Sequence, residues 1–330
     1  GTGSIGLEIV RQLLKYNPKV VRIFARHEDR HYTVMHDLGL DNNSVRFIVG
    51  DIRDRDRLRM AMEGVDIVFH AAALKHVPIC EYNPFEAVKT NIIGTQNVIE
   101  VARESNVKHV IGISTDKVAE PQSVLGVSKL MAEKLFLATF YYKGDKDTKF
   151  SCVRFGNVLG SRGSILPLFK KQIFDNGEIT VTDPEMTRFI MTIPQAVNLV
   201  LNSASLSRGQ EIFVLKMPSV KIGELARAAI EYYAPLAGKK PSQIKIKYIG
   251  KRDSEKQHEK LLASHELGHV LDTGSMYILT PHEKIGELEY SKAYPGAVKI
   301  RKGDKKFLSE YAAKLSHSQL INLVKEADLR

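Results

Sequence analysis

Short β-branched runs alternate with helix-length segments through the first 160 residues, and this alternation restricts the possible folds more than any other feature of the chain. In the first helical segment, Ile5, Ile9 and Leu13 fall on one face of a helix. Strands separated by helix-length connections form βαβ units, so the sequence predicts an α/β fold with a doubly wound parallel sheet. The runs predicted as strands are residues 20–25, 45–49, 65–69, 110–115 and 150–154.

After about residue 160 the pattern becomes less regular, and no internal repeat is found. A chain of 330 residues is long enough for one large domain or two. We therefore expect residues 161–330 to form mainly a smaller, mixed α/β lobe, with some return to the first part of the chain. The predicted helices are residues 165–174, 193–202, 220–233 and 307–327, and the predicted short strands are residues 211–215 and 244–249.

A glycine-rich turn, Gly1-Thr2-Gly3-Ser4-Ile5-Gly6, leads directly into the first predicted helix. Glycines let the backbone turn tightly and approach a pyrophosphate, and a helix N-terminus offers unpaired N–H groups at the positive end of the helix dipole. A turn of this type normally follows a strand, so we expect the given sequence to begin one strand late. Residues 1–160 are thus predicted to be a dinucleotide-binding domain of the Rossmann type.

Three further groups follow predicted strands and suit a dinucleotide. Arg26 stands where an NAD site typically has an acidic residue for the ribose, and a guanidinium suits the 2′-phosphate of NADP. NADP is therefore favoured, with NAD as the alternative. Asp51, which precedes Ile52, could accept a hydrogen bond from an adenine amino group, and Ala71-Ala72-Ala73 would let a flat ligand lie against the backbone. Each group also has a simpler interpretation. Arg26 could be a solvated surface charge, Asp51 a helix N-cap, and the three alanines a site of close helix–sheet packing.

The polar run Ser114-Thr115-Asp116-Lys117 ends the fifth predicted strand, and Lys129 follows in a helix-compatible segment. In an open parallel sheet, ligands bind in the crevice at the carboxyl ends of the strands. These side chains are therefore candidates for catalysis. The alternative is that Asp116 and Lys117 form a surface ion pair that caps the strand.

Ordered fragments of the chain resemble extended short-chain dehydrogenase/reductase proteins, and among these the UDP-N-acetylglucosamine 4,6-dehydratases of capsule and flagellin-glycan synthesis. The resemblance begins at the glycine turn and runs to about residue 261. It implies a lyase with the Rossmann fold already expected. Besides the turn, it rests on residues 50–54, 70–78, 90–95, 114–117, 154–164, 186–189 and 252–259.

The resemblance implies a reaction in which the cofactor removes hydride from sugar C4, a base takes the C5 proton, an acid assists loss of the C6 hydroxyl, and the hydride returns to C6. It gives Lys117 the role of base and Asp116 that of acid. Their proximity opposes both roles, because it favours an ion pair over the neutral amine and the protonated carboxyl that are needed. The residues alone therefore leave the protonation states open.

One position departs from the superfamily pattern. The superfamily places a tyrosine four residues before the motif lysine, which puts both side chains on one helix face. Here Leu125 precedes Lys129 at that spacing, and leucine cannot move a proton. Some dehydratases of this family carry methionine there, so an apolar residue at this position is compatible with activity. Because Leu125 cannot take a proton, Thr115 or a bound water would take the proton of the C4 hydroxyl. The change weighs against a nucleotide-sugar epimerase or reductase, which is the alternative within the superfamily.

The resemblance also distributes the ligand contacts. It assigns Asn91 and Lys129 to the cofactor, in addition to the residues named above. For the substrate it implies three arginines, because a planar guanidinium binds two phosphate oxygens at once, together with an asparagine for the pyrophosphate, a lysine near the sugar and a glutamate for a ribose hydroxyl. The family commonly self-associates, so we expect a homo-oligomer. The implied substrate residues are Lys75, Asn157, Arg162, Arg188, Arg252 and Glu255.

A competing motif, His265-Glu266-Leu267-Gly268-His269, fits the zinc-peptidase pattern of two histidines at i and i+4 with a glutamate between them. Residues 254–269 could form a helix that places both imidazoles on one face. Gly268 weakens such a helix, and no clear third ligand follows, although Glu283 and Glu287 are nearby. We therefore expect no metal site, and a zinc peptidase is the minor alternative.

The net charge of +10 and the sequence pI near 9.3 are the unusual features of the composition, and they suit nucleic acid, an anionic surface or phosphate-bearing ligands. The arginines of residues 53–59 alternate with acidic residues, which is typical of a solvated helix face, so we expect no nucleic-acid partner. No apolar run is long enough to span a membrane, and Cys80 and Cys152 are too few for a disulfide framework. We expect a cytoplasmic enzyme whose positive charge partly serves the phosphates of the cofactor and of UDP.

Overall fold

A central mixed sheet is the main element of the computed structural model, which describes residues 1–39, 44–142, 144–280, 293–300 and 303–329. Its strands are β3 (Ile67–His70), β4 (His109–Ile113), β5 (Lys149–Arg154), β9 (Ile212–Leu215), β12 (Val270–Asp272), β13 (Met276–Leu279) and β14 (Val298–Lys299). Their order is β14-β12-β13-β9-β5-β4-β3. The four strands from β3 to β9 run parallel, and β13, β12 and β14 continue the sheet in antiparallel pairs.

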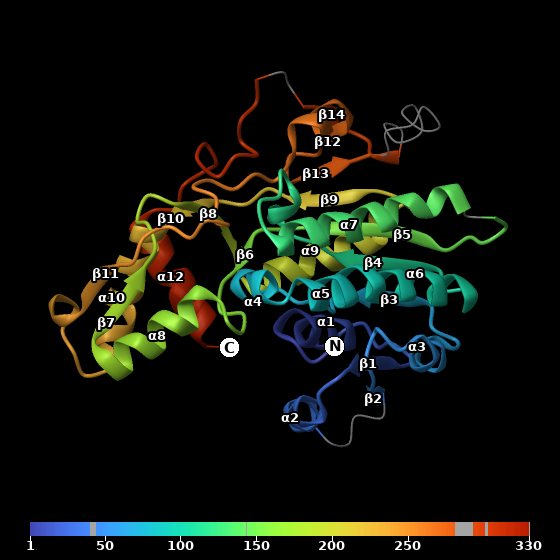
Figure 1. The fold of residues 1–330 in the computed structure, drawn as a ribbon, viewed down its shortest axis with the longest axis horizontal. Coiled ribbons are helices and arrows are strands. Elements are labelled where there is room, and N and C mark those ends of the chain that lie inside the picture. Colours follow the sequence, from blue (N-terminus) through green and yellow to red (C-terminus); the bar gives the residue numbers. More distant parts are fainter. Residues whose placement is uncertain (40–43, 143, 281–292, 301–302, 330) are drawn as a thin grey trace.

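Helices cover both faces of this sheet, as the alternation in the sequence predicts. Figure 1 shows α6 (Gly94–Glu104) and α7 (Val124–Ala138) in front of the strands and α9 (Ile193–Leu206) behind them, and α1 (Ser4–Leu14) packs against α9. The doubly wound α/β fold is thereby confirmed, and the five predicted strands match the structure to within two residues at each end. The buried core between the layers includes Val110, Ile111, Phe150, Val153 and Phe213.

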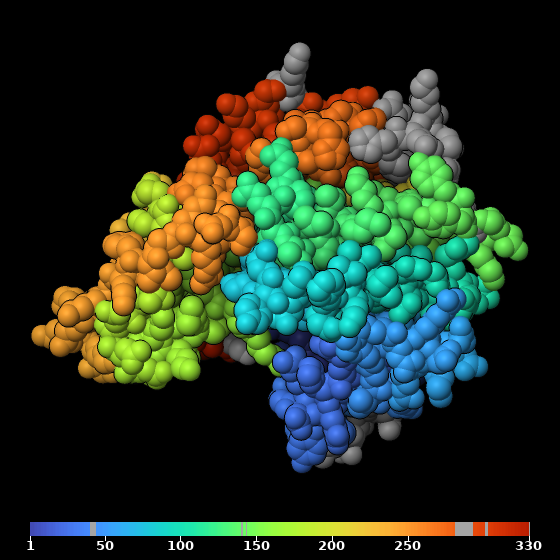
Figure 2. Space-filling view, viewed as in Figure 1, coloured from blue at the N-terminus to red at the C-terminus, as the bar shows by residue number. Residues whose placement is uncertain are grey.

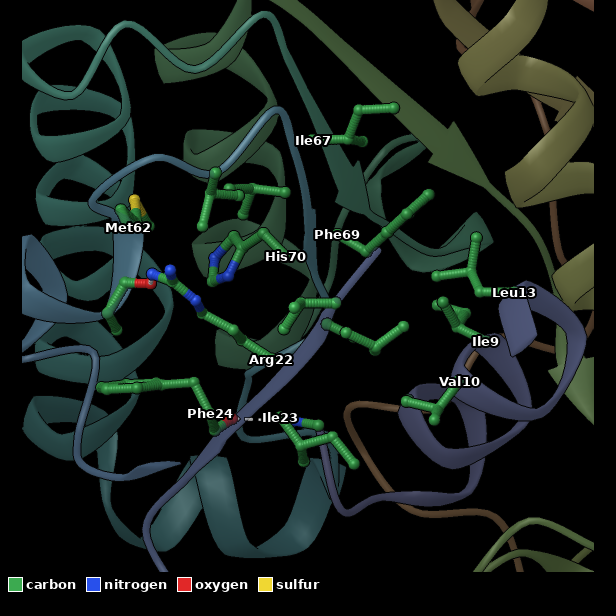
Figure 3. A pocket seen from close by; sticks show the side chains of 18 of the residues that line it. Ile9, Val10, Leu13, Arg22, Ile23, Phe24, Met62, Ile67, Phe69 and His70 are labelled. Atoms are coloured by element: carbon green, nitrogen blue, oxygen red, sulfur yellow. Dashed lines mark hydrogen bonds between the residues drawn. The ribbon is translucent and has the colours of Figure 1, made fainter. Parts of the chain in front are cut away.

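A separate parallel pair, β1 (Val21–Ala25) and β2 (Val45–Val49), lies beside β3. A cavity of about 580 Å³ lies between β1 and β3, and its lining is mostly apolar. Figure 3 shows Leu13 of α1, Ile23 of β1 and Phe69 of β3 around this cavity.

A second, smaller core lies at the left of Figure 1, where α8 (Ile165–Asn176), α10 (Ile222–Leu236) and α12 (His317–Asp328) pack together. Because β9, β12, β13 and β14 belong to the central sheet, the chain after residue 160 contributes to both parts. The assignment of nucleotide binding to residues 1–160 and of substrate binding to residues 161–330 stays a prediction. The strands of the smaller part are β6 (Asn157–Val158), β7 (Glu178–Val181), β8 (Thr187–Met191), β10 (Ser219–Lys221) and β11 (Lys245–Tyr248).

The helix predicted over residues 307–327 is wrong in its first half. The structure begins this helix only at His317, after Ser316, which forms a capping box with the third residue of the helix. The chain before it is held by pairing with a distant segment, in which the Leu261 N–H donates to the Phe307 carbonyl. Tertiary pairing therefore overrides a locally helical pattern.

The helix predicted over residues 220–233 begins two residues late for a similar reason. Val220 pairs with Arg188 in the antiparallel ladder of β10 and β8, and the helix begins at Ile222. The short β-strand therefore takes the residues that the pattern assigned to the first turn of the helix.

Among the residues that the structure describes, no helix combines the length and the apolar character that crossing a membrane requires. Cys80 and Cys152 are both free and buried. Neither cysteine is therefore part of a disulfide.

Candidate active site

The parallel strands of the first half of the chain end next to residues that the sequence analysis singled out. Arg26 follows β1, Asp51 follows β2 after one glycine, Ala71 follows β3, and Thr115 follows β4 after one serine. The carboxyl ends of parallel strands lie at one edge of a sheet, which is the usual ligand position in open α/β proteins. Arg26 and Asp51 thus lie at the carboxyl edge of the β1–β2 pair, and Ala71 and Thr115 lie at the carboxyl edge of the parallel part of the central sheet.

The glycine turn leaves the first turn of α1 open. Gly3 is the N-cap residue and has an extended backbone, and no side chain caps the amides that follow it. A Cβ atom on Gly6 would lie 2.5 Å from the Gly1 carbonyl oxygen, so this close approach requires glycine. The N–H groups of Ser4, Ile5 and Gly6 lie in the first turn of the helix. They have no hydrogen-bond acceptor within the helix, because no helical carbonyl group precedes them. The turn therefore fits a pyrophosphate.

Arg26 and Asp51 lie side by side, with Arg26 Nη1 3.6 Å from Asp51 Oδ2. Asp51 is held more closely by Arg53, whose guanidinium donates to Oδ2 at 2.7 Å and whose backbone N–H donates to Oδ1 at 2.9 Å. Burial opposes ionisation of Asp51, but the hydrogen bonds and charge of Arg53, together with Arg26, keep its pKa below the usual range. Ile52 is buried against Gly94 at the start of α6. The exposed Arg26 guanidinium thus has only a loose partner and can take an anionic ligand.

Asn91 positions the loop that follows β3. Its side-chain oxygen accepts a hydrogen bond from the Leu74 N–H at 2.8 Å, and its amide nitrogen donates to the Leu74 carbonyl and to Ser128 Oγ at 3.1 and 3.0 Å. It lies in a π-helical turn, η1 (Val88–Ile93), a feature that is frequent at functional sites. Because its oxygen and both N–H groups are engaged, Asn91 ties the loop beginning at Ala71-Ala72-Ala73 to α7.

Lys129 is buried on α7 beneath the end of β4, where its Nζ donates to the Ile113 carbonyl at 2.6 Å. Burial lowers the pKa of Lys129, and the charges of Cys152 and Glu133 reduce this effect. Leu125, four residues earlier, is buried in a small apolar cluster. The structure therefore fills the usual tyrosine position with an apolar side chain.

Asp116 and Lys117 form an ion pair at the end of β4, in which the Lys117 side chain is 25% exposed. Lys117 Nζ donates to Asp116 Oδ1 at 3.0 Å and to Asn157 Oδ1 at 3.4 Å, and Thr115 Oγ1 also donates to Asp116 Oδ1 at 3.0 Å. Asp116 is completely buried, and its Oδ2 atom has no hydrogen-bond partner. The alternative of a surface ion pair is therefore wrong. A buried carboxylate oxygen without a partner is costly, which indicates that it is placed for a ligand.

Three charged residues from the second half of the chain complete the surroundings of Lys117. Glu259 Oε1 lies 3.8 Å from Lys117 Nζ and 3.9 Å from Arg188 Nε, and Glu259 Oε2 lies 3.9 Å from Lys256 Nζ. Glu259 and Lys256 are not among the site residues predicted from the sequence, although both fall in a fragment that carries the family resemblance. Asp116, Lys117, Arg188, Lys256 and Glu259 are called the Lys117 cluster below.

The Lys117 amine is charged in this arrangement. Burial by itself lowers the pKa of Lys117, and Arg188 acts in the same direction, but the Asp116 and Glu259 carboxylates outweigh both and raise the pKa above its ordinary value. This outcome agrees with the expectation that proximity favours the ion pair. Lys117 must therefore lose a proton before it can act as a base.

The predicted substrate residues lie in separate places around the site. Arg162 lies at the glycine turn, where its guanidinium donates to the Thr2 carbonyl at 2.8 Å. Burial and the charge of Arg162 lower the pKa of Lys75, which places these two cations near each other. Arg252 forms a 3.1 Å ion pair with Glu255, whose Oε2 atom is buried without a hydrogen-bond partner. The predicted substrate residues in contact with Lys117 or Glu259 are Asn157 and Arg188.

The zinc-peptidase motif does not form the α-helix that its spacing needs. Ser264–His269 is a 3₁₀ helix, in which residues four apart point in different directions, so the α-helix that the zinc-peptidase alternative requires over residues 254–269 does not form. Both oxygens of Glu266 accept hydrogen bonds from Arg154 at 2.9 Å, so this carboxylate belongs to the fold. No group of three or more potential metal ligands is found among the described residues. The two carboxylates considered as third ligands lie outside the described residues, at Glu283 and Glu287.

The fold and the strand-end site together define a Rossmann-type α/β protein. Within this class, the chain belongs to the family described as "Polysaccharide biosynthesis protein", whose model matches residues 1–281. It is 41% identical over 291 residues to a Campylobacter jejuni protein named UDP-N-acetylglucosamine 4,6-dehydratase (inverting), with 88% of this chain and 83% of the relative covered. The family resemblance inferred from the motifs is confirmed.

Other relatives carry different names at comparable similarity. A Rickettsia bellii protein named UDP-glucose 4-epimerase is 40% identical over 298 residues, which cover 89% of this chain and 84% of the relative. The X-ray structure of Pen from Bacillus thuringiensis superposes with a TM-score of 0.92 at 40% identity and covers 100% of this chain and 96% of that chain. A Streptomyces venezuelae dTDP-glucose 4,6-dehydratase, solved with NAD and TYD bound, shares the fold, with a TM-score of 0.69, 23% identity, and 78% and 84% covered.

Proposed function

We propose that this protein is a nucleotide-sugar 4,6-dehydratase that uses a nicotinamide cofactor and acts on UDP-N-acetylglucosamine. The observation that carries the proposal is the Asp116–Lys117 pair at the end of β4, in which a buried carboxyl with an unpartnered oxygen lies beside an amine. Removal of water from neighbouring carbons needs one group that takes a proton and one that gives a proton. An epimerase that acts only at C4 needs no such pair. The name of the C. jejuni relative supports the same activity.

Thr115 connects this pair to the sugar in the proposed reaction. Its hydroxyl donates to Asp116 Oδ1, so a proton that Thr115 receives from the C4 hydroxyl can pass to Asp116. We assign Thr115 this role because Leu125 fills the usual tyrosine position. The protonated Asp116 then donates to the C6 hydroxyl, which leaves as water, and neutral Lys117 takes the C5 proton. When the hydride is added at C6, a proton that has exchanged with solvent is returned to C5. Protonation of Asp116 also removes one of the two charges that hold Lys117 as an ammonium ion.

A nicotinamide cofactor would accept the hydride from sugar C4 and return it to C6. The residues present fit such a group, because the first turn of α1 is uncapped and Gly6 lets the backbone come close to a pyrophosphate. Lys129, whose Nζ donates to the Ile113 carbonyl at the end of β4, would orient the nicotinamide ribose. We propose NADP as the cofactor, because Arg26 is exposed at the ribose position and Asp51 is already engaged by Arg53.

The cationic residues around the sheet edge would bind the UDP part of the substrate. Arg162 donates to the Thr2 carbonyl of the glycine turn, so it lies between the cofactor site and the loop that carries Lys75. A guanidinium in this place can meet phosphate oxygens of the substrate. The full set proposed for the substrate is Lys75, Asn157, Arg162, Arg188, Arg252 and Glu255.

Incubation of the purified protein with NADP and UDP-N-acetylglucosamine tests this function directly. We expect mass spectrometry to show a product lighter by one water and, in D₂O, one deuterium at C5. A second incubation, with UDP-glucose in place of UDP-N-acetylglucosamine, tests the sugar that appears in the name of the R. bellii relative. An unchanged mass with altered stereochemistry would show an epimerase and contradict the dehydratase proposal, as would the absence of any product.

The cofactor proposal predicts that Arg26→Ser weakens NADP binding about tenfold or more, because a hydrogen bond between charged groups contributes about 1.5–3 kcal/mol. NAD binding should change less than about twofold. Isothermal titration with both cofactors measures the difference, and Arg30→Ser, a nearby exposed arginine of α2 (Glu28–Leu38), is the control. An equal loss for both cofactors would contradict the assignment of Arg26 to the 2′-phosphate.

We further propose that the chain forms a homo-oligomer through the face made by α4 (Val77–Tyr82), α5 (Pro84–Ala87) and α7. Figure 2 shows these segments, in cyan and green, next to each other on one face. Tyr82 is 88% exposed and Phe85 80% exposed, and aromatic side chains of this kind are enriched at protein interfaces. The double variant Tyr82→Glu, Phe85→Glu should be a monomer by light scattering under conditions where the wild type is an oligomer. A monomeric wild type would contradict the proposal.

A further inference from the structure

The Lys117 cluster contains a buried carboxylate that stability does not explain. Glu259 is 3% exposed, and its Oε2 atom has no hydrogen-bond partner. Its cationic neighbours lie at 3.8–3.9 Å, which is beyond hydrogen-bonding distance. The structural ion pairs of Arg154 differ from those of Glu259 because they include hydrogen bonds. Arg154 donates five hydrogen bonds, four of them to the carboxylates of Glu133 and Glu266. Burial of a carboxylate without such bonds is unfavourable, so Glu259 needs another explanation.

The backbone around Glu259 is fixed by a second set of contacts. Its N–H donates to Ser309 Oγ at 2.8 Å, and the Ser309 N–H donates back to the Glu259 carbonyl at 2.9 Å. Thr187 Oγ1 lies 2.6 Å from Ser309 Oγ and 2.8 Å from His258 Nδ1. Thr187 precedes Arg188 on β8, so this network fixes the Glu259 carboxylate relative to the cations around it.

We propose that Glu259 is the positioning residue that holds the Lys117 amine and sets its charge for removal of the C5 proton. This inference rests on the proposed dehydratase function. In that reaction Asp116 is protonated, so Glu259 is the carboxylate that still faces Lys117 when the C5–H bond breaks and its proton is transferred to Nζ. A carboxylate about 4 Å away stabilises the positive charge that develops on the partly buried Lys117 amine. Arg188 Nε and Lys256 Nζ also face Glu259, each at 3.9 Å from one of its carboxylate oxygens.

Glu259→Gln tests this role because it keeps the shape of the side chain and removes its charge. The other charged groups around Lys117, which are Asp116, Arg188 and Lys256, stay in place. The acid limb of kcat/KM against pH should move down by about one pH unit, because one carboxylate fewer holds the proton on Lys117. The plateau should fall about tenfold, since a neutral amide stabilises the developing charge less.

Two further variants make the comparison specific. Glu259→Asp keeps the charge at a greater distance from Lys117, so it should show smaller changes in the same directions, and it carries the test if Glu259→Gln does not fold. Glu185→Gln removes an exposed carboxylate that is paired with Lys221, and it should match the wild type in both limb and plateau. A purely structural role for Glu259 would lower activity without moving the limb.

A direct titration of the Lys117 amine separates this inference from the proposed function. Acylation by acetic anhydride over a pH series, followed by mass spectrometry of the peptide that contains Lys117, reports the fraction of neutral amine without turnover. At pH 8, Glu259→Gln should label Lys117 about tenfold faster than the wild type, which corresponds to a shift of about one unit. Unmoved labelling and an unmoved limb in a folded Glu259→Gln variant would overturn the inference. Shifted labelling in a protein that forms no dehydrated product would instead overturn the proposed function and support the role of Glu259.

Discussion

A Lys117→Met variant is expected to convert UDP-N-acetylglucosamine about a thousandfold more slowly than the wild type while it still binds the cofactor. Methionine nearly keeps the length of the side chain but removes the amine that takes the C5 proton, and acid–base catalysis by one positioned group contributes on the order of 10²–10⁴ in rate. The proposed cofactor contacts at the glycine turn and Arg26 do not use this amine. Mass spectrometry of the product measures the loss, and isothermal titration with NADP measures the retained binding.

Lys260→Met is the matched control for this variant. Lys260 lies on the same segment as Glu259 but forms an outward ion pair with Glu120 at 2.6 Å, so its removal should change the rate less than about twofold. Exchange of the C5 hydrogen in D₂O should disappear in Lys117→Met together with the product. Continued exchange at C5 in that variant would show that another group is the base.

The pH dependence of the wild type follows from the same charges. Asp116 and Glu259 raise the pKa of Lys117, so the neutral amine is the minority form at neutral pH. If neutral Lys117 is the base, kcat/KM rises as the pH increases toward that raised pKa. This direction is opposite to the one expected for a reaction that uses the ammonium form of Lys117 as an acid.

The elements of the nucleotide-binding half could be predicted from the sequence because local and tertiary preferences agree there. The β-branched runs form strands, and the helix after the glycine turn has one apolar face, so each pattern has one low-energy arrangement. Residues 307–316 and Val220 show where this agreement ends. Both have a helical pattern, but they pair with segments distant in sequence, and such partners cannot be read from local spacing.

The candidate site was predictable where its residues follow strands directly. Thr115, Asp116 and Lys117 are consecutive, so the end of one strand places them together. Glu259 and Lys256 could not be assigned in this way, because they reach Lys117 from a segment more than a hundred residues away that has no regular secondary structure. Their position depends on the pairing of residues 258–259 with β8 and Ser309, which only the fold shows.

Glu266, the glutamate of the zinc-like motif, also has a partner that is distant in the sequence. Glu266 meets Arg154 at the end of β5, and Glu133 of α7 meets the same guanidinium from the other side. The three side chains are 0–4% exposed. This triad ties residues 261–266 to the central sheet, and the same segment carries Lys256 and Glu259 just before it. The motif that resembles a metal site therefore has a structural role that affects the proposed active site.

Arg154→Met is accordingly expected to destabilise the protein by about 3–5 kcal/mol, because it leaves two buried carboxylates without their partner. Urea unfolding followed by circular dichroism measures this change. Arg59→Met is the control, since Arg59 pairs with Asp56 and Glu104 at the surface, and its loss should cost less than about 1 kcal/mol. An equal decrease in the free energy of unfolding for Arg154→Met and Arg59→Met would contradict the claim that burial makes the Arg154 ion pairs more important than those at the surface.

Two further measurements separate the unpaired charges from the lost packing around Arg154. Adding Glu133→Gln and Glu266→Gln to Arg154→Met removes both uncompensated charges, so the triple variant should recover part of the lost stability. Burial opposes ionisation of Glu266, but Arg154 and the Ala263 N–H lower its pKa below the ordinary value. The stability that this lowered pKa provides is present above the pKa of the unfolded chain and is lost as the pH falls through the folded value. The difference between the wild type and Arg154→Met should therefore narrow in acid, and a constant difference down to pH 3 would show that lost packing rather than unpaired charge causes the effect.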